Sequence, residues 1–191
     1  MYGELLGDKR FFGLLLRLDE DLATQARAAG CVVCGRRVHT GNFRRKARGV
    51  PRGLEADYEW RFSFCCADRE CRKRLTPRSM RFLGRKIYLG AVVVLVSALR
   101  CGATPVRVAR LTEILGVSRR TVDRWRQWWT EVFPQTRCWA EGSALFATPV
   151  PAGQLPLSLL ERFAGAPETA LQALLRFVLP ITGGDTMVRA M

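Results

Sequence analysis

The spacing of the cysteines restricts the fold of this chain more than any other feature, because a shared metal ion would join segments far apart in sequence. The chain has 7 cysteines. Cys31 and Cys34 form a C-x2-C pair followed directly by Gly35, and Cys66 and Cys71 form a C-x4-C pair. Two such pairs supply the four thiolates of a tetrahedral, structural Zn²⁺ site. We therefore predict one closed, non-catalytic zinc ion per chain.

The choice of Cys66 in the second pair rests on strand geometry. Cys65 directly precedes Cys66, so either thiol could join Cys71. Side chains alternate between the two faces of a strand. A strand here would place Phe62, Phe64 and Cys66 on one face and turn Cys65 to the other. This alternation favours Cys66, with Cys65 as the alternative.

Other residues of the metal-binding type fit the site less well. His39 is the only histidine, and it follows the first cysteine pair closely enough to replace one thiolate. Cys101 and Cys138 have no cysteine neighbours, so we interpret them as reduced core thiols. Residues 31–75 are rich in arginine and poor in aliphatic side chains, and a bound metal would supply folding free energy that such a small core lacks.

The positive charge is concentrated around the cysteines. The formal net charge is +14, and residues 31–90 carry 16 Lys and Arg against 5 Asp and Glu. A basic cluster of this kind favours a polyanionic partner, although a solvated basic loop is the plainer alternative. The candidates for phosphate contacts are Arg44, Arg45 and Lys46 between the cysteine pairs and Arg72, Lys73 and Arg74 after the second pair.

Residues 107–129, RVARLTEILGVSRRTVDRWRQWW, contain two short helical patterns joined by a glycine. Apolar residues recur at helical spacing up to Leu115, Gly116 permits a tight turn, and Val117 fills the corner. Ser118 is a good N-cap for the second helix. The pattern predicts a helix-turn-helix, and an ordinary helical hairpin is the alternative.

The second of these helices is strongly amphipathic. Val122, Trp125 and Trp129 fall on one stripe, which we expect to be buried. On the opposite stripe, Arg120, Arg124 and Gln127 would face the major groove of DNA. We also expect Ser118 and Arg119, at the start of the helix, to contact phosphates or nearby bases.

The rest of the chain predicts further helices. We expect Ser79 to cap a helix that runs through an uncharged apolar segment towards Leu99; that segment is too short to span a bilayer. Residues 155–165 and 167–178 read as amphipathic helices that serve the core or dimerisation. The predicted fold is α+β and mostly α. Its segments are a packing segment at 1–30, a zinc-ribbon-like module at 31–78, a helix-turn-helix domain at 79–133 and a helical extension at 134–191.

Three motifs together, the C-x2-C knuckle, the run CRKRLTPRS and the run GVSRRTVDRW, resemble the DNA-binding region of bacterial insertion-sequence transposases over roughly residues 31–130. In those families a zinc ribbon and a helix-turn-helix recognise the terminal repeats, and a separate domain carries a DDE catalytic triad. We find no counterpart of the triad, since Asp123, Glu141 and Asp185 do not form a plausible two-metal set. The resemblance implies a non-enzymatic accessory or regulatory DNA-binding protein of a mobile element.

The expected partner is double-stranded DNA. A transposase or another protein could bind through the C-terminal helices, and a homodimer is compatible with the sequence. The N-terminus has no secretory pattern, so we expect a cytoplasmic, nucleoid-associated protein of a bacterium and no membrane partner. The rival hypothesis is a zinc-stabilised interaction subunit of a transposase, recombinase or other nucleic-acid complex, with non-specific contacts to DNA or RNA.

Overall fold

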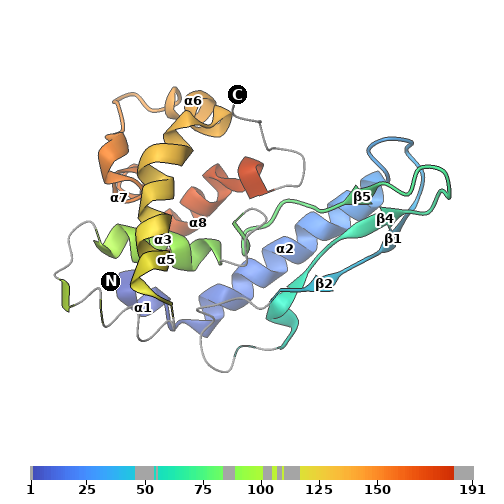
Figure 1. The fold of residues 1–191 in the computed structure, drawn as a ribbon, viewed down its shortest axis with the longest axis horizontal. Coiled ribbons are helices and arrows are strands. Elements are labelled where there is room, and N and C mark those ends of the chain that lie inside the picture. Colours follow the sequence, from blue (N-terminus) through green and yellow to red (C-terminus); the bar gives the residue numbers. More distant parts are fainter. Residues whose placement is uncertain are drawn as a thin grey trace.

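A computed structural model describes residues 2–45, 54, 56–83, 89–100, 105–106, 109 and 117–182. It confirms the predicted fold class, since helices dominate and the strands form only small antiparallel sheets. A helical body carries an elongated arm, whose described part consists of the C-terminal half of helix α2 and residues 30–45 and 56–75 (Figure 1). Among the described helices, none combines the length and apolar character needed to cross a membrane.

Helix α2 (Lys9–Ala29) connects the body to the tip of the arm (Figure 1). Asp8 caps its start by accepting a hydrogen bond from the backbone N–H of Arg10. Gly30 ends the helix with φ of 77°, a left-handed conformation that favours glycine. A Cβ at Gly30 would lie only 2.9 Å from the carbonyl oxygen of Gly35, so the chain can turn tightly into the first cysteine pair. Gly30 therefore ends the helix that makes up most of the predicted packing segment at 1–30.

The arm holds a three-stranded antiparallel sheet in the order β1-β4-β5. Val38 pairs with Cys66, and Phe64 pairs with Leu75. Phe64 and Cys66 are buried with Val38 in a small core beside α2, and Cys65 between them is only partly buried. The alternation predicted from the sequence is thus correct. The strands of this sheet are β1 (Val38–Thr40), β4 (Phe64–Cys66) and β5 (Arg74–Leu75). A separate antiparallel pair consists of β2 (Phe43–Arg44) and β3 (Trp60–Arg61), and the 3₁₀ turn Ala56–Glu59 directly precedes β3.

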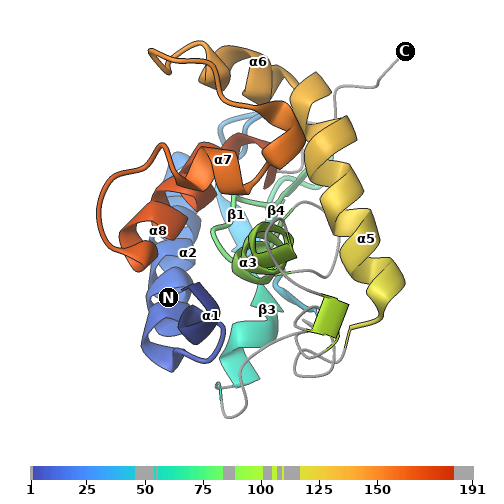
Figure 2. The same cartoon turned by 90° about the vertical axis from the view of Figure 1, so that its left-hand side faces the viewer.

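The body surrounds helix α3 (Gly90–Arg100), which lies at its centre in the end-on view of Figure 2. Five consecutive residues of α3, from Val92 to Val96, are at most 2% exposed. A helix that is apolar on all sides is a core helix. The other body elements are α1 (Tyr2–Leu5), α5 (Arg119–Gln127), π turn η2 (Trp128–Val132), η3 (Phe133–Gln135), α6 (Arg137–Ser143), η4 (Ala152–Gln154), α7 (Leu157–Leu160), α8 (Pro167–Phe177) and η5 (Leu179–Thr182).

The helix expected to begin after Ser79 begins at Gly90 instead. Ser79 is buried, and its hydroxyl donates a hydrogen bond to the carboxylate of Asp19 on α2. Arg81, which lies in the segment expected to be helical, is fully buried against the same carboxylate. Asp19 itself is 1% exposed. The predicted helix start at Ser79 is therefore wrong, because the buried polar groups of these residues satisfy one another.

Of the two predicted C-terminal helices, the first is shorter than expected. Helix α8 begins at Pro167, as expected for a proline in the first helical turn. Helix α7 covers only Leu157–Leu160 of the predicted range 155–165. Both helices contribute buried leucines to the core of the body, among them Leu159 and Leu171. These leucines serve the core of this chain.

Candidate metal centre and nucleic-acid interface

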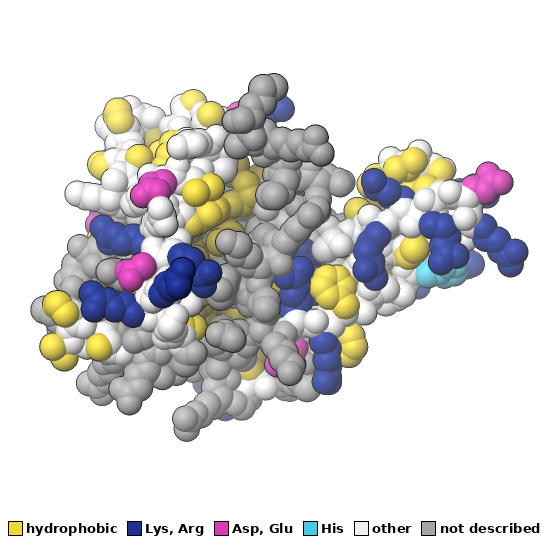
Figure 3. Space-filling view, in the orientation of Figure 1, with side chains coloured by type: hydrophobic (Ala, Val, Ile, Leu, Met, Phe, Trp, Pro, Cys, Tyr) yellow, Lys and Arg dark blue, Asp and Glu magenta, His cyan; other side chains and the backbone are white. Residues whose placement is uncertain are grey.

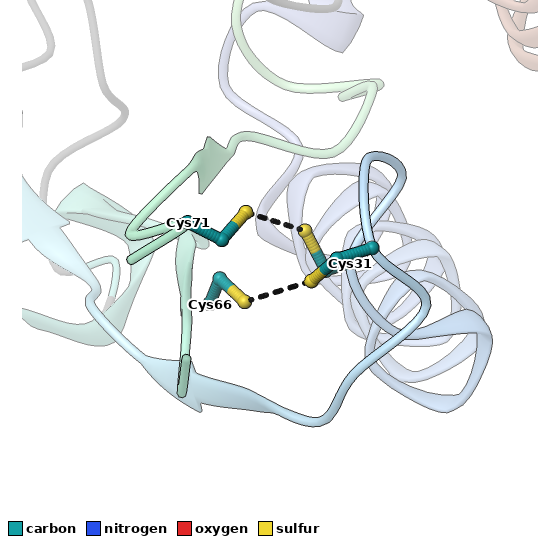
Figure 4. Close-up of side chains that lie close together, drawn as sticks. Cys31, Cys66 and Cys71 are labelled. Carbon is teal, nitrogen blue, oxygen red and sulfur yellow. Dashed lines mark hydrogen bonds between the residues drawn. The ribbon is translucent and has the colours of Figure 1, made fainter. Parts of the chain in front are cut away.

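The four predicted cysteine ligands come together at the end of α2 that points away from the body. Their sulfur atoms all lie within 4.8 Å of one another. The Sγ atoms of Cys31 and Cys71 are 3.7 Å apart, and those of Cys34 and Cys66 are 3.4 Å apart. All four are free thiols, and in Figure 4 the labelled sulfurs converge on one point. This arrangement can hold a metal ion.

A tight turn presents the first cysteine pair. The backbone N–H of Gly35 donates to the carbonyl of Cys31 at 2.8 Å, and the N–H of Cys31 donates to the carbonyl of Arg36 at 2.8 Å. Gly35 has φ of 69°, which a residue with a side chain would adopt only with strain. The glycine after C-x2-C therefore allows the turn, as the sequence predicted.

Asp68 organises the second cysteine pair. Its Oδ1 accepts hydrogen bonds from the backbone N–H groups of Glu70 at 2.8 Å and Cys71 at 3.3 Å. Its Oδ2 forms an ion pair of 2.6 Å with Arg36 in the first turn. Those backbone hydrogen bonds, with Arg36, keep the pKa of Asp68 below its ordinary value. One carboxylate therefore ties the two cysteine loops together.

The thiols of the cluster differ in acidity. The backbone N–H groups of Val33 and Cys34 stabilise the thiolate of Cys31 and lower its pKa from 9.0 to about 6. Burial raises the pKa of Cys66 to about 12. A metal ion binds thiolates, so it must displace the proton of Cys66 and finds Cys31 already ionised at neutral pH.

The two alternative ligands lie outside the cluster. His39 and Cys65 pair across strands β1 and β4, and neither belongs to the group of sulfurs. The thiol of Cys65 instead donates to the carbonyl of Arg72 at 3.5 Å. The thiol of Cys138 donates to the carbonyl of Phe177 at 3.4 Å, which fits a core thiol, and Cys101 lies outside the described residues.

The arm carries many exposed basic side chains on the face seen in Figure 3. Of the predicted phosphate contacts, Arg44, Arg72, Lys73 and Arg74 are exposed, Arg45 is partly buried, and Lys46 lies outside the described residues. Three further arginines, which were not predicted as contacts, are exposed as well: Arg36, Arg37 and Arg69. Arg36 and Arg37 directly follow the C-x2-C-G turn. Because such a turn leaves the next side chains in solvent, their exposure could have been predicted from the sequence.

Aromatic rings hold several of these guanidinium groups in place. Arg74 lies 5.6 Å and Arg45 lies 5.3 Å from the ring centre of Phe43. Arg44 lies over the ring of Trp60 at 5.4 Å. Cation–π contacts of this kind reduce the freedom of long side chains, so the charges are partly preorganised.

An open groove of about 510 Å³ lies between α2 and the strand region of the arm. Leu16 and Glu20 of α2 line it on one side, and Asp57, Trp60 and other residues line it on the other. Both charged residues among its described lining are acids. Its described lining therefore holds no basic side chain, but basic side chains border it, because Arg44 lies over the ring of Trp60 and Arg74 donates to the carbonyl of Gly41.

The second helix of the predicted helix-turn-helix is present as α5. The side chain of Ser118 caps it by accepting a hydrogen bond from the backbone N–H of Thr121. Val117, Val122, Trp125 and Trp129 are at most 5% exposed, as predicted. The first helix of the motif falls almost entirely outside the described residues, so the crossing of the two helices stays a prediction.

The opposite face of α5 is polar. Arg119, Arg120, Arg124 and Gln127 are exposed. Gln127 donates to the carboxylate of Glu131 at 2.8 Å, and Arg124 donates to the hydroxyl of Thr121 at 3.4 Å. The predicted set of side chains thus lies in solvent on one helix, and two of its members are held by neighbours.

The basic side chains of the body and of the arm are visible on the same face of the molecule (Figure 3). Helix α2 links the two parts, because its Phe12 belongs to the same core as Val122 and Trp125 of α5 and its Ala23 belongs to the core of the arm. Known proteins give no guide to this arrangement: no family model, curated protein or solved structure matches the chain.

Proposed function

We propose that this protein binds double-stranded DNA, with α5 in the major groove and the basic arm on the phosphate backbone. One observation carries the proposal. Helix α5 buries Val122, Trp125 and Trp129 and exposes Arg120, Arg124 and Gln127 on the opposite side. A recognition helix needs this division, because one face must anchor it to the protein and the other must reach base edges.

The chemistry of the exposed face fits base recognition. Arginine can donate two hydrogen bonds to O6 and N7 of guanine, and glutamine can bond both N6 and N7 of adenine. Arg124 and Gln127 each have an intramolecular partner close by, and both side chains are exposed enough to exchange it for a base. Ser118 and Arg119 lie at the start of the helix, where N–H groups favour a phosphate.

We further propose that the four cysteines bind one structural Zn²⁺ per chain. A tetrahedral site with Zn–S distances of about 2.3 Å places the sulfurs roughly 3.8 Å apart. The sulfur pairs at 3.4 and 3.7 Å fit such a site. Four protein ligands complete the coordination, so the role is structural. The ion would stabilise an arm whose own apolar core is small.

In this proposal the arm supplies affinity that does not depend on the DNA sequence. Arg72, Lys73 and Arg74 follow the second cysteine pair, and Arg44 and Arg45 precede it on the neighbouring sheet. Contacts from such groups to phosphates release counterions and give affinity and orientation. In this proposal α5 selects the sequence while the arm fixes the protein on the duplex.

The cellular role that we propose is that of an accessory or regulatory protein of a mobile element, without catalytic activity. This role rests on the resemblance of the cysteine pairs and of residues 107–129 to transposase DNA-binding regions. A partner transposase or a second copy would have to contact exposed residues of the C-terminal segment, because Leu159, Leu171 and Leu174 are buried in the body.

Selection of bound duplexes from a random pool tests the proposal, followed by one matched pair of variants. We expect Arg124→Ala to lose about 1–3 kcal/mol of discrimination between the selected duplex and a scrambled one. Arg137→Ala removes an arginine of α6 that is also exposed and should leave the discrimination unchanged. An equal loss of Arg124→Ala on every duplex, or a pool without a consensus, would instead favour the interaction subunit with non-specific contacts.

A further inference from the structure

The tip of the arm exposes two neighbouring valines. Val32 and Val33 lie between the first two cysteines, and they are 64% and 65% exposed. Most other large apolar side chains of the described residues are buried or partly buried, and Val106, Val132 and Leu145 are the remaining exposed ones. Paired apolar side chains at the end of a projecting arm are unusual enough to need an explanation.

The cysteine turn holds these side chains in solvent. The hydrogen bonds of Gly35 and Arg36 with Cys31 close the turn on both sides. The backbone N–H groups of Val33 and Cys34 point towards the sulfur of Cys31. The backbone therefore faces the cluster, and the valines cannot turn inward unless the cysteine ligands separate.

The charge around the valines indicates the kind of partner that they contact. Two loops adjoin at the tip, because the N–H of Ala67 donates to the carbonyl of Arg37 at 2.9 Å and Arg36 pairs with Asp68. The exposed charged side chains of these loops are Arg36, Arg37, Arg69, Glu70, Arg72 and Lys73. An apolar pair with this excess of positive charge is complementary to a nucleic-acid groove, where sugars and base edges lie between rows of phosphates.

We propose that Val32 and Val33 enter a groove of the bound DNA duplex and make apolar contacts with sugars and base edges, while Arg36 and Arg37 contact the flanking phosphates. This inference rests on the proposed DNA binding. It makes the cysteine turn a contact element in its own right. The affinity then has two contributions. The apolar contacts do not depend on salt, whereas the phosphate contacts do, because only phosphate contacts release counterions.

The test measures the dissociation constant of the metal-loaded full-length protein for a mixed-sequence duplex at several salt concentrations. We expect the double variant Val32→Ser/Val33→Ser to bind on the order of tenfold more weakly at every salt concentration, with an unchanged salt slope. The variant Arg37→Ala, which removes one of the two proposed phosphate contacts beside the valines, should lower the salt slope by about 0.9. Leu145→Ser, at a site 84% exposed on the body, should bind like the original protein.

Three results would overturn the inference. The serine variant could bind the duplex like the original protein, which would leave the tip for another partner while DNA binding stands. It could lose salt slope together with affinity, which would show that the tip acts through charge. If the original protein binds no duplex, the proposed function fails as well. The metal content of each sample is measured as a control. If the serine variant loses metal, the variant Val32→Thr/Val33→Thr, which keeps the shape of the side chains, is used in its place, and the expected results are the same.

Discussion

The Nε atom of Arg81 lies 2.9 Å from Oδ2 of Asp19, and neither side chain is exposed to solvent. Arg81 also donates to the carbonyls of Tyr58 and Trp60, each at 2.7 Å. The carboxylate of Asp19 accepts further hydrogen bonds from Ser79 and from the backbone of Met80. This buried pair therefore joins α2 to the strand region of the arm and to the segment that leads into the body.

Removal of one partner should be costly. We expect Asp19→Ala to lower the free energy of unfolding by about 3–5 kcal/mol, because it leaves the charge of Arg81 buried without a counterion. Glu20→Ala, at the exposed neighbouring position, should change it by less than about 0.5 kcal/mol. Urea denaturation measures both values, and similar effects of the two substitutions would contradict a structural role for the pair.

The adjacent cysteines of β4 offer a matched test of the metal site. Cys66→Ser should abolish stoichiometric metal binding, while Cys65→Ser should retain it, because only the sulfur of Cys66 lies in the cluster. Elemental analysis of the purified variants measures the metal. Removal of the metal with a chelator should increase hydrogen exchange in β1 and β4 far more than in α3, because Val38, Phe64 and Cys66 pack in a small core separate from the one that contains α3. Metal loss from both serine variants, or from neither, would refute this assignment.

The pH dependence of the metal-free protein follows from two thiols with opposite shifts. The pKa of Cys31 is lowered from 9.0 to about 6, so between these values the unfolded state binds more protons and stability rises with pH. The pKa of Cys66 is raised from 9.0 to about 12, so above pH 9.0 the folded state binds more protons and stability falls. The free energy of unfolding should therefore be greatest near pH 9.

Urea titrations in chelator and a thiol reductant, repeated across this pH range, measure that dependence. Cys31→Ser should remove the rise below pH 9 and leave the fall above it. A rise of the same size in Cys31→Ser would mean that other groups cause it.

Several parts of the structure could be predicted because their signals are local. The ligand set follows from cysteine spacing and from strand alternation, which separates Cys66 from Cys65 within a single strand. Helix α5 follows from a cap at Ser118 and a 3.6-residue apolar period through Trp129. Gly30 marks the end of α2 because a left-handed residue is needed there.

Other parts depended on contacts between distant residues. Asp19 and Arg81 are 62 positions apart, and nothing near either residue indicates that both are buried. The same pairing keeps Ser79 out of a helix, so α3 begins only at Gly90. The sequence alone determined which cysteines can ligate a metal and which face of α5 is polar, since spacing and periodicity act within one element. Only the tertiary structure decided which charges leave the surface, because burial of a charge requires a partner that folding brings from elsewhere in the chain.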